Sequence, residues 1–221
     1  RVEELPINID LAIILTPAAT VPVFLDQLGE RGVQYAVIET AGFSEFSAQG
    51  AQIEQEIARI AEKWKIKIVG PNCVGVLCME SGINSVFVNM EGKEIQAGDV
   101  SVISQSGGIF LTLVDFLTAS GLGVSKAVSV GNKLVLSEPD YISYFQQDAH
   151  TKTILLYLES IYNGRELVKG AQQGSKPVVI YKSNTSQASA EVARSHTAAL
   201  SNDDQLVSAA FQQFGVTRVY S

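Results

Sequence analysis

The strongest constraint on this sequence is a regular alternation between short runs rich in β-branched residues and longer amphipathic runs. Residues 9–70 follow the order strand, helix, strand, helix, strand. The expected strands are 9–15, 34–39 and 66–70, and the expected helices are 20–32 and 47–64. This βαβαβ order predicts a parallel sheet covered by helices.

A second alternating series follows an irregular stretch that ends near residue 94. Its expected strands are 99–105, 124–130, 152–159, 176–182 and 216–221, and its expected helices are 107–121, 137–148, 164–174 and 204–215. A polar segment at 183–202 interrupts the series. We therefore expect two doubly wound α/β units, residues 1–93 and 94–221, whose ligands lie beyond the carboxyl ends of the strands.

Composition excludes several classes of function. The net charge of −7 argues against binding of nucleic acid, which needs a basic surface. No apolar run approaches the ~20 residues of a membrane span, and residues 1–10 lack the apolar core of a signal peptide. Cys73 and Cys78 have no further cysteines with which to form a zinc site, so we expect reduced thiols, no metal and a soluble cytoplasmic protein.

The turn "SQSGG" is the sharpest candidate for a ligand site. It places Ser104, Ser106, Gly107 and Gly108 between an expected strand and an apolar helix. Free N–H groups at the helix start would bind a phosphate well. The alternative is that Ser106 only caps the helix and the glycines make a tight turn. A similar turn, "GPNCVG", contains Asn72, although an Asn in such a turn most often bonds its own backbone.

Two ionisable residues suggest phosphoryl transfer. Glu159 ends an otherwise apolar strand, so its carboxylate emerges at the carboxyl edge of the sheet and needs a partner. His196, in "RSHTAAL", could be that partner, because a carboxylate that holds one ring nitrogen makes imidazole a good nucleophile toward phosphorus. On its own His196 would be read as a loop residue exposed to solvent, as we read His150.

Taken together, the turns resemble those of the NDP-forming acyl-CoA synthetases. The motifs "GPNC", "SQSGG", "VGNK", "LYLE", "KPVVIYKS" and "RSHTAAL" occur in the order seen in the α part of the ADP-forming acetyl-CoA synthetases, which are similar to succinyl-CoA synthetase. The resemblance implies a partial Rossmann-like CoA-binding domain followed by a flavodoxin-like domain with a phosphohistidine loop. The family begins with two further β–α units, which we expect the natural protein to have.

The resemblance also implies residue roles. His196 would carry the phosphoryl group and Glu159 would steady it. The residues implied to contact phosphate are Ser104, Ser106, Gly107, Gly108, Gly131 and Asn132. The residues implied to contact CoA are Pro17, Thr40, Gly42, Pro71, Asn72 and Cys73. Two positions depart from the family pattern: Ala198 replaces a common glycine, and Ser160 replaces the glycine of "LEG". Turnover would suffer if position 198 required a positive φ.

The implied reaction has three reversible steps. Phosphate attacks an acyl-CoA to give acyl phosphate and free CoA; His196 takes the phosphoryl group and releases the acid; phosphohistidine then phosphorylates ADP. The last step needs ADP/ATP and Mg²⁺ on an ATP-grasp β subunit or domain, and we expect a hetero- or homo-oligomer. One sequence leaves open the small carboxylic acid and the choice between ADP and GDP.

Two other functions remain open at this point. The chain could be a non-catalytic module that senses CoA or acyl-CoA, such as the synthetase-like region of some protein lysine acetyltransferases. Retention of His196 with Glu159 favours the enzyme, whereas a fused acetyltransferase domain would favour the sensor. A flavodoxin-like cofactor binder fits the alternation but explains neither "RSHTAAL" nor "GPNC".

Overall fold

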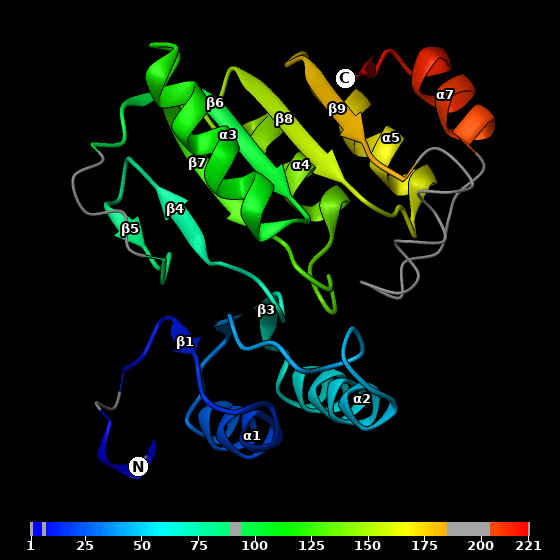
Figure 1. Cartoon of the computed structure of the whole chain (residues 1–221). Coiled ribbons are helices and arrows are strands. Elements are labelled where there is room, and N and C mark those ends of the chain that lie inside the picture. The colour runs from blue at the N-terminus through cyan, green and yellow to red at the C-terminus, as the bar shows by residue number, and fades with distance from the viewer. Residues whose placement is uncertain (1, 6–7, 89–93, 185–203, 221) are drawn as a thin grey trace.

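The computed structural model describes residues 2–5, 8–88, 94–184 and 204–220 and contains two separate sheets (Figure 1). The smaller sheet has the order β1-β2-β3, and neighbouring strands are parallel. Its strands are β1 (Ala12–Ile14), β2 (Tyr35–Ile38) and β3 (Lys67–Val69). Its helical elements are the 3₁₀ turns η1 (Val2–Glu4) and η2 (Ala18–Thr20) and the helices α1 (Val21–Glu30) and α2 (Ala48–Trp64).

The two helices of the smaller unit lie side by side on the face of the sheet that is turned away from the larger sheet (Figure 1). Right-handed crossovers that always step in the same direction, from β1 to β2 to β3, place both helices on one face. Over its described residues this unit is therefore wound in one direction only. The expectation that the first unit is doubly wound is wrong for this part of the chain.

The larger sheet has seven strands in the order β10-β9-β8-β6-β7-β4-β5. Its strands are β4 (Val76–Cys78), β5 (Ile83–Asn84), β6 (Ala97–Ser104), β7 (Val124–Ser129), β8 (Thr153–Leu158), β9 (Val178–Lys182) and β10 (Thr217–Val219). Its helices are α3 (Gly107–Ala119), α4 (Glu138–Gln147), α5 (Gly164–Gln172) and α7 (Asp204–Gln213). The strand order reverses at β6, and α3 lies on one face while α4 and α5 lie on the other (Figure 1), as expected for a doubly wound unit.

β4 and β5 were not predicted. They lie between residues 71 and 93, where we expected no strand and which we assigned to the first unit, yet β4 pairs antiparallel with β7, and β5 with β4. Strands of three and two residues are too short to show a period of two in the sequence. The larger sheet therefore draws residues from before the expected boundary at 93/94.

Separate apolar cores support the two sheets. Leu25, Ile38 and Ile57 are fully buried between the small sheet and its helices. Both faces of the larger sheet are buried as well, one around Phe110 below α3 and the other around Ile142 of α4. Apolar burial of this kind contributes about 25 cal/mol per Å². Among the described residues, no helix is both long and apolar enough to cross a bilayer.

Candidate functional site

The carboxyl ends of the two sheets meet along a seam. The turn after β3 contains Pro71, whose carbonyl oxygen accepts the N–H of Asn132 at 2.9 Å from the turn after β7. The chain beyond Asn132 then runs along the open edge of β3. There the Leu134 and Leu136 N–H groups donate to the carbonyls of Gly70 and Ile68 at 3.1 and 3.2 Å. Residues that the sequence assigned to CoA and to phosphate therefore lie in direct contact.

Side chains extend this contact. The Asn72 amide donates to Asn132 Oδ1 at 3.2 Å, and Asn132 Nδ2 donates to Glu45 Oε2 at 2.7 Å. The other carboxylate oxygen of Glu45 accepts the N–H groups of Gly42 and Phe43 at 2.7 and 3.1 Å. Burial alone would raise the pKa of Glu45, but these hydrogen bonds outweigh it and hold the pKa below its usual value. Glu45 is therefore a charged anchor that the sequence did not reveal.

Three other predicted CoA contacts gather at the carboxyl edge of the small sheet. Pro17 follows β1 and accepts the N–H of Thr20 at 2.9 Å at the start of α1. The Thr40 hydroxyl donates to the Thr16 carbonyl at 2.7 Å, and the Thr40 carbonyl accepts the N–H of Asn72 at 2.9 Å. Gly42 has a φ of 105°, which favours glycine. The fold therefore brings Pro17, Thr40, Gly42 and Asn72 to one edge.

Cys73 is different, because its side chain points into the protein. The thiol is buried and lies 3.4 Å from the Ile38 carbonyl, to which it donates. Burial raises its pKa to about 12, so the group is a neutral thiol at pH 7. Cys73 shapes the "GPNC" turn from inside. Cys78 is also a free thiol, partly exposed on β4.

The "SQSGG" turn forms the start of α3. Ser106 is the N-cap and its hydroxyl accepts the Ile109 N–H at 3.4 Å, so the capping interpretation is correct as a description of its local role. Ser104 is fully buried and donates to the Ser106 carbonyl at 2.7 Å, which places its hydroxyl inside the turn. A Cβ on Gly107 would lie 2.8 Å from Val74, whereas one on Gly108 would meet nothing closer than 4.0 Å. The helix start is therefore tight on one side and open on the other.

Glu159 directly follows β8, at the carboxyl edge as expected, and is partly buried. His196 and Ala198 lie outside the described residues, so the pairing of Glu159 with His196 stays a prediction. Ser160, the departure in "LES", is fully buried and does not have a positive φ. Serine in place of glycine therefore introduces no backbone strain at this position.

A polar network around these turns was missed by the sequence analysis. Gln105 lies inside the "SQSGG" turn and Lys133 inside the "VGNK" turn, and both side chains reach the Glu159–Ser160 backbone. The Lys133 ammonium is buried and pairs with the buried Glu138 carboxylate at 2.6 Å. Both residues stood in the quoted motifs, but only the fold shows that they converge.

The sequence analysis also missed Glu39, the first residue after β2. Its carboxylate is buried, and within the described part of the chain neither oxygen has a partner at hydrogen-bonding geometry. Burial raises the pKa of Glu39, against a smaller opposing effect of the Ser85 hydroxyl. A Cβ on Gly75 would lie 2.7 Å from Glu39 Oε1, so glycine admits this carboxylate into the seam.

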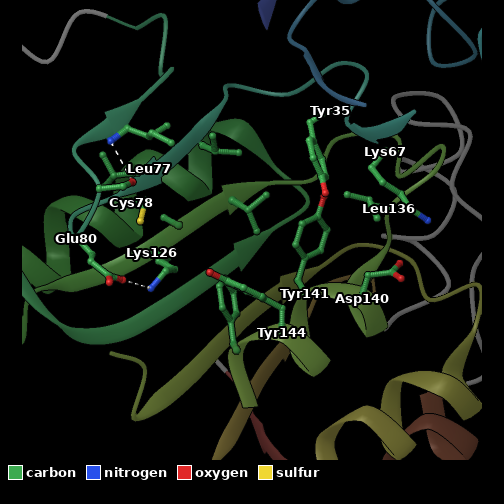
Figure 2. Close-up of a pocket in the computed structure, with 16 residues that line it drawn as sticks. Tyr35, Lys67, Leu77, Cys78, Glu80, Lys126, Leu136, Asp140, Tyr141 and Tyr144 are labelled. Atoms are coloured by element: carbon green, nitrogen blue, oxygen red, sulfur yellow. Dashed lines mark hydrogen bonds and ion pairs between the residues drawn. The ribbon is translucent and has the colours of Figure 1, made fainter. Parts of the chain in front are cut away.

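A cavity of about 840 Å³ lies beside the seam and contains none of the predicted site residues (Figure 2). Tyr35 and Lys67 border it from the small sheet, and Tyr141 and Tyr144 border it from α4 (Figure 2). Burial raises the pKa of Tyr141 well above its usual value. No group of acidic, histidine or cysteine side chains in the described ranges could hold a metal ion.

Comparison with known proteins identifies the family. The family model described as "Succinyl-CoA ligase like flavodoxin domain" matches residues 97–221. This chain belongs to that family. A second model, described as "CoA binding domain", matches residues 1–79 of this succinyl-CoA ligase-like chain. Both matches confirm the predicted superfamily of NDP-forming acyl-CoA synthetases, and with it the fold class.

The relatives of this succinyl-CoA ligase-like chain include ligases from archaea. It is 38% identical over 220 residues to "Acetate--CoA ligase [ADP-forming] I" of Archaeoglobus fulgidus, covering 99% of this chain and 32% of that protein. It is 35% identical to "Acetate--CoA ligase [ADP-forming] I subunit alpha" of Pyrococcus furiosus, covering 99% of this chain and 47% of the subunit. The chain thus spans 32% to 47% of the length of these relatives.

The solved structures that resemble it include an acetyl-coenzyme A synthetase 1 of Candidatus Korarchaeum cryptofilum, described as dinucleotide forming and in complex with phosphate and ADP. The TM-score is 0.92 at 32% identity, and the match covers 100% of this chain and 47% of that one. A TM-score this high includes the relative placement of both sheets. The two sheets are therefore placed relative to each other much as in that synthetase.

Proposed function

We propose that this chain is the part of an ADP-forming acyl-CoA synthetase that binds CoA and carries the phosphohistidine. One observation supports this most directly: among the described residues, the turns of four family motifs lie along one seam. Pro71 and Asn72 of "GPNC" contact Asn132 of "VGNK", and Gln105 of "SQSGG" contacts the Glu159 turn of "LYLE". These contacts between motifs that are far apart in the sequence support a single site along the seam.

CoA fits the carboxyl edge of the small sheet. The positive end of the α1 helix dipole lies at this edge and would favour a diphosphate there, with the Thr20 and Val21 N–H groups already bonded to the Pro17 and Ala18 carbonyls. Thr40 and Gly42 offer a turn whose backbone a ligand can approach closely. We place the thioester end of CoA near Pro71, Asn72 and the outer side of the Cys73 backbone, because these residues lie where the two sheets meet. When bound, CoA supplies the thiol that forms and leaves the acyl thioester.

Phosphoryl transfer fits the carboxyl edge of the larger sheet. The N–H groups of Gly107 and Gly108 at the start of α3 would receive the phosphoryl group, next to Gly131 and Asn132. Ser106 positions this helix start as its cap, and Ser104 braces the turn from inside. His196 would take the phosphoryl group on one ring nitrogen while the Glu159 carboxylate accepts a hydrogen bond from the other. The step depends on positioning and on charge, since backbone amides make up most of the site.

The rest of the reaction needs parts beyond these residues. We propose an ATP-grasp subunit or domain that binds ADP/ATP and Mg²⁺, a small carboxylic acid as substrate, and a cytoplasmic assembly of the two parts. The alpha subunit named among the relatives supports such an assembly. We also propose that residues 1–93 bind CoA and residues 94–221 transfer the phosphoryl group.

The test uses the full-length protein together with its ATP-grasp part, Mg²⁺ and γ-labelled ATP. We expect acid-labile, base-stable label on the wild type, no label on His196→Ala, and slower labelling of Glu159→Gln. The control is His150→Ala, since His150 pairs with Glu80 on an exposed surface. Equal labelling of wild type and His196→Ala would overturn the proposal. Binding of CoA with no label on any variant would favour the sensing module instead.

A further inference from the structure

All four backbone polar groups of Glu159 and Ser160 are bonded to side chains. The two N–H groups donate to Gln105, the Glu159 carbonyl accepts from Lys182, and the Ser160 carbonyl accepts from Lys133. Turns at strand ends more often bond their own backbone or water. Here three side chains, from the turns after β6 and β7 and from the last residue of β9, hold one dipeptide.

Gln105 holds this dipeptide from the side of α3. Its Oε1 atom accepts the N–H of Glu159 at 2.9 Å and the N–H of Ser160 at 3.0 Å, and it also lies 3.3 Å from Lys133 Nζ. Its Nε2 atom donates to the Ser160 hydroxyl at 3.1 Å. The Gln105 backbone N–H also donates to the Tyr157 carbonyl at 2.9 Å. The amide can therefore take only one orientation.

Two buried ammonium groups hold the carbonyls. Lys133 Nζ lies 2.8 Å from the Ser160 carbonyl and 2.6 Å from Glu138 Oε1, with only 1% of its side chain exposed. Lys182 Nζ lies 2.8 Å from the Glu159 carbonyl and 2.5 Å from the Ser183 carbonyl. Lys182 reaches the turn from β9, which is next to β8. Lys133 reaches it from the other side, from the turn after β7.

Stability alone does not account for this arrangement. Burying an ammonium group costs several kcal/mol of desolvation, and a buried ion pair is often no more stabilising than apolar residues of the same volume. Two buried ammonium groups on one dipeptide are therefore not needed to stabilise a loop. They do fix the backbone of Glu159, and with it the direction in which the Glu159 side chain leaves that backbone.

We propose that Gln105, Lys133 and Lys182 are positioning residues that fix the Glu159 backbone so that its carboxylate meets the imidazole that is phosphorylated. The inference rests on the proposed function and deepens it. Ser160 takes part, because its hydroxyl accepts from Gln105 and lies 3.4 Å from Lys133 Nζ. The serine of "LES" thereby adds a hydrogen-bond partner that glycine lacks.

The test is a double-mutant cycle in the full-length protein with its ATP-grasp part. The variants are Gln105→Leu, Glu159→Gln and the two combined, and the readout is the single-turnover rate of protein labelling from γ-labelled ATP. We expect Gln105→Leu to slow labelling about tenfold or more while the KM for CoA stays within about twofold. In the Glu159→Gln background, the same change should have little further effect, because Gln105 acts through Glu159.

Controls separate positioning from folding. Gln105→Glu keeps an oxygen for both N–H groups and should restore part of the rate, and Gln147→Leu alters an exposed glutamine that bonds only within α4. If Gln105→Leu does not fold, Lys182→Met in the same cycle tests the inference from the other side of the turn. Rates that multiply in the double variant, or a wild-type rate in Gln105→Leu and Lys182→Met, would overturn the inference. Absence of label on wild type would overturn the proposed function itself.

Discussion

Gly131 lies directly against Pro71 across the seam: a Cβ on Gly131 would be 2.1 Å from the Pro71 carbonyl oxygen. Its φ of 53° also lies in the left-handed region. Gly131→Ala should therefore lower the free energy of unfolding by about 3 kcal/mol or more, and urea denaturation would measure it.

The matched control for that change is Gly82→Ala. Gly82 has a φ of 72° but nothing within 4 Å of an added Cβ, so only the backbone penalty of about 1 kcal/mol applies. Similar losses for the two variants would show that the close approach to Pro71 does not constrain the seam.

The hydrogen bond from Asn132 to Glu45 gives a second prediction. Asn132→Asp would place a second carboxylate where the amide now donates at 2.7 Å, and should lower the free energy of unfolding at neutral pH by about 2 kcal/mol. Adding Glu45→Gln should restore most of this loss, because glutamine can donate to the new carboxylate. Denaturant unfolding of the two single variants and the double variant gives the coupling. A double variant that loses the sum of both single effects would contradict the contact.

The pair Lys126 and Asp148 on the larger sheet gives a third. The two groups are 2.8 Å apart and both side chains are at least nine-tenths buried, so Lys126→Met would leave a buried carboxylate without its cation. We expect a loss of about 3 kcal/mol in the free energy of unfolding. Lys152→Met, in the exposed pair with Asp99, is the control and should cost about 1 kcal/mol or less. Equal costs would mean that burial of the first pair has no energetic effect.

Glu39 gives a prediction about pH. Since its pKa in the folded protein is raised above the usual value of 4.5, the folded state binds its proton more tightly than the unfolded state does. The contribution of Glu39 to stability is therefore complete below that value and is lost as pH rises through the raised pKa. Glu39→Gln removes this titration.

The free energy of unfolding of Glu39→Gln, relative to wild type, should consequently increase as the pH rises from 4.5 through the raised pKa of Glu39. Urea denaturation of both proteins across this range is the measurement, and Glu62→Gln on α2 serves as a control. A difference that stays constant with pH would show that burial does not raise the pKa of Glu39 in the folded protein.

Long, strongly periodic segments were predictable from the sequence alone. The helix expected at 47–64 is α2, Ala48–Trp64, and the strand expected at 152–159 is β8, Thr153–Leu158. Ser47 is the N-cap of α2, since its hydroxyl accepts the Gly50 N–H at 3.0 Å. Here periodicity and capping point to the same boundary.

The polar interior was not predictable in the same way. Lys133 and Glu138 look like ordinary surface residues of a turn and a helix, and Gln105 looks like a spacer between two serines. Their burial depends on three strand ends that meet only after the sheet has formed, which is information that no local pattern holds. Glu39 was missed for the same reason: its carboxylate is buried against Gly75, which belongs to another turn.

The antiparallel pairing of β4 with β7 has a consequence for how this protein can be divided. The CoA-binding family model ends at residue 79 and includes β4, although β4 is hydrogen-bonded into the other sheet. The segment that is recognisable as an inherited module and the segment that folds as a body are therefore not the same. A fragment that begins at residue 94 would lose β4 and β5 and expose the edge of β7 to pairing with a second molecule. A fragment that begins just before Val76 would keep β4 paired with that edge.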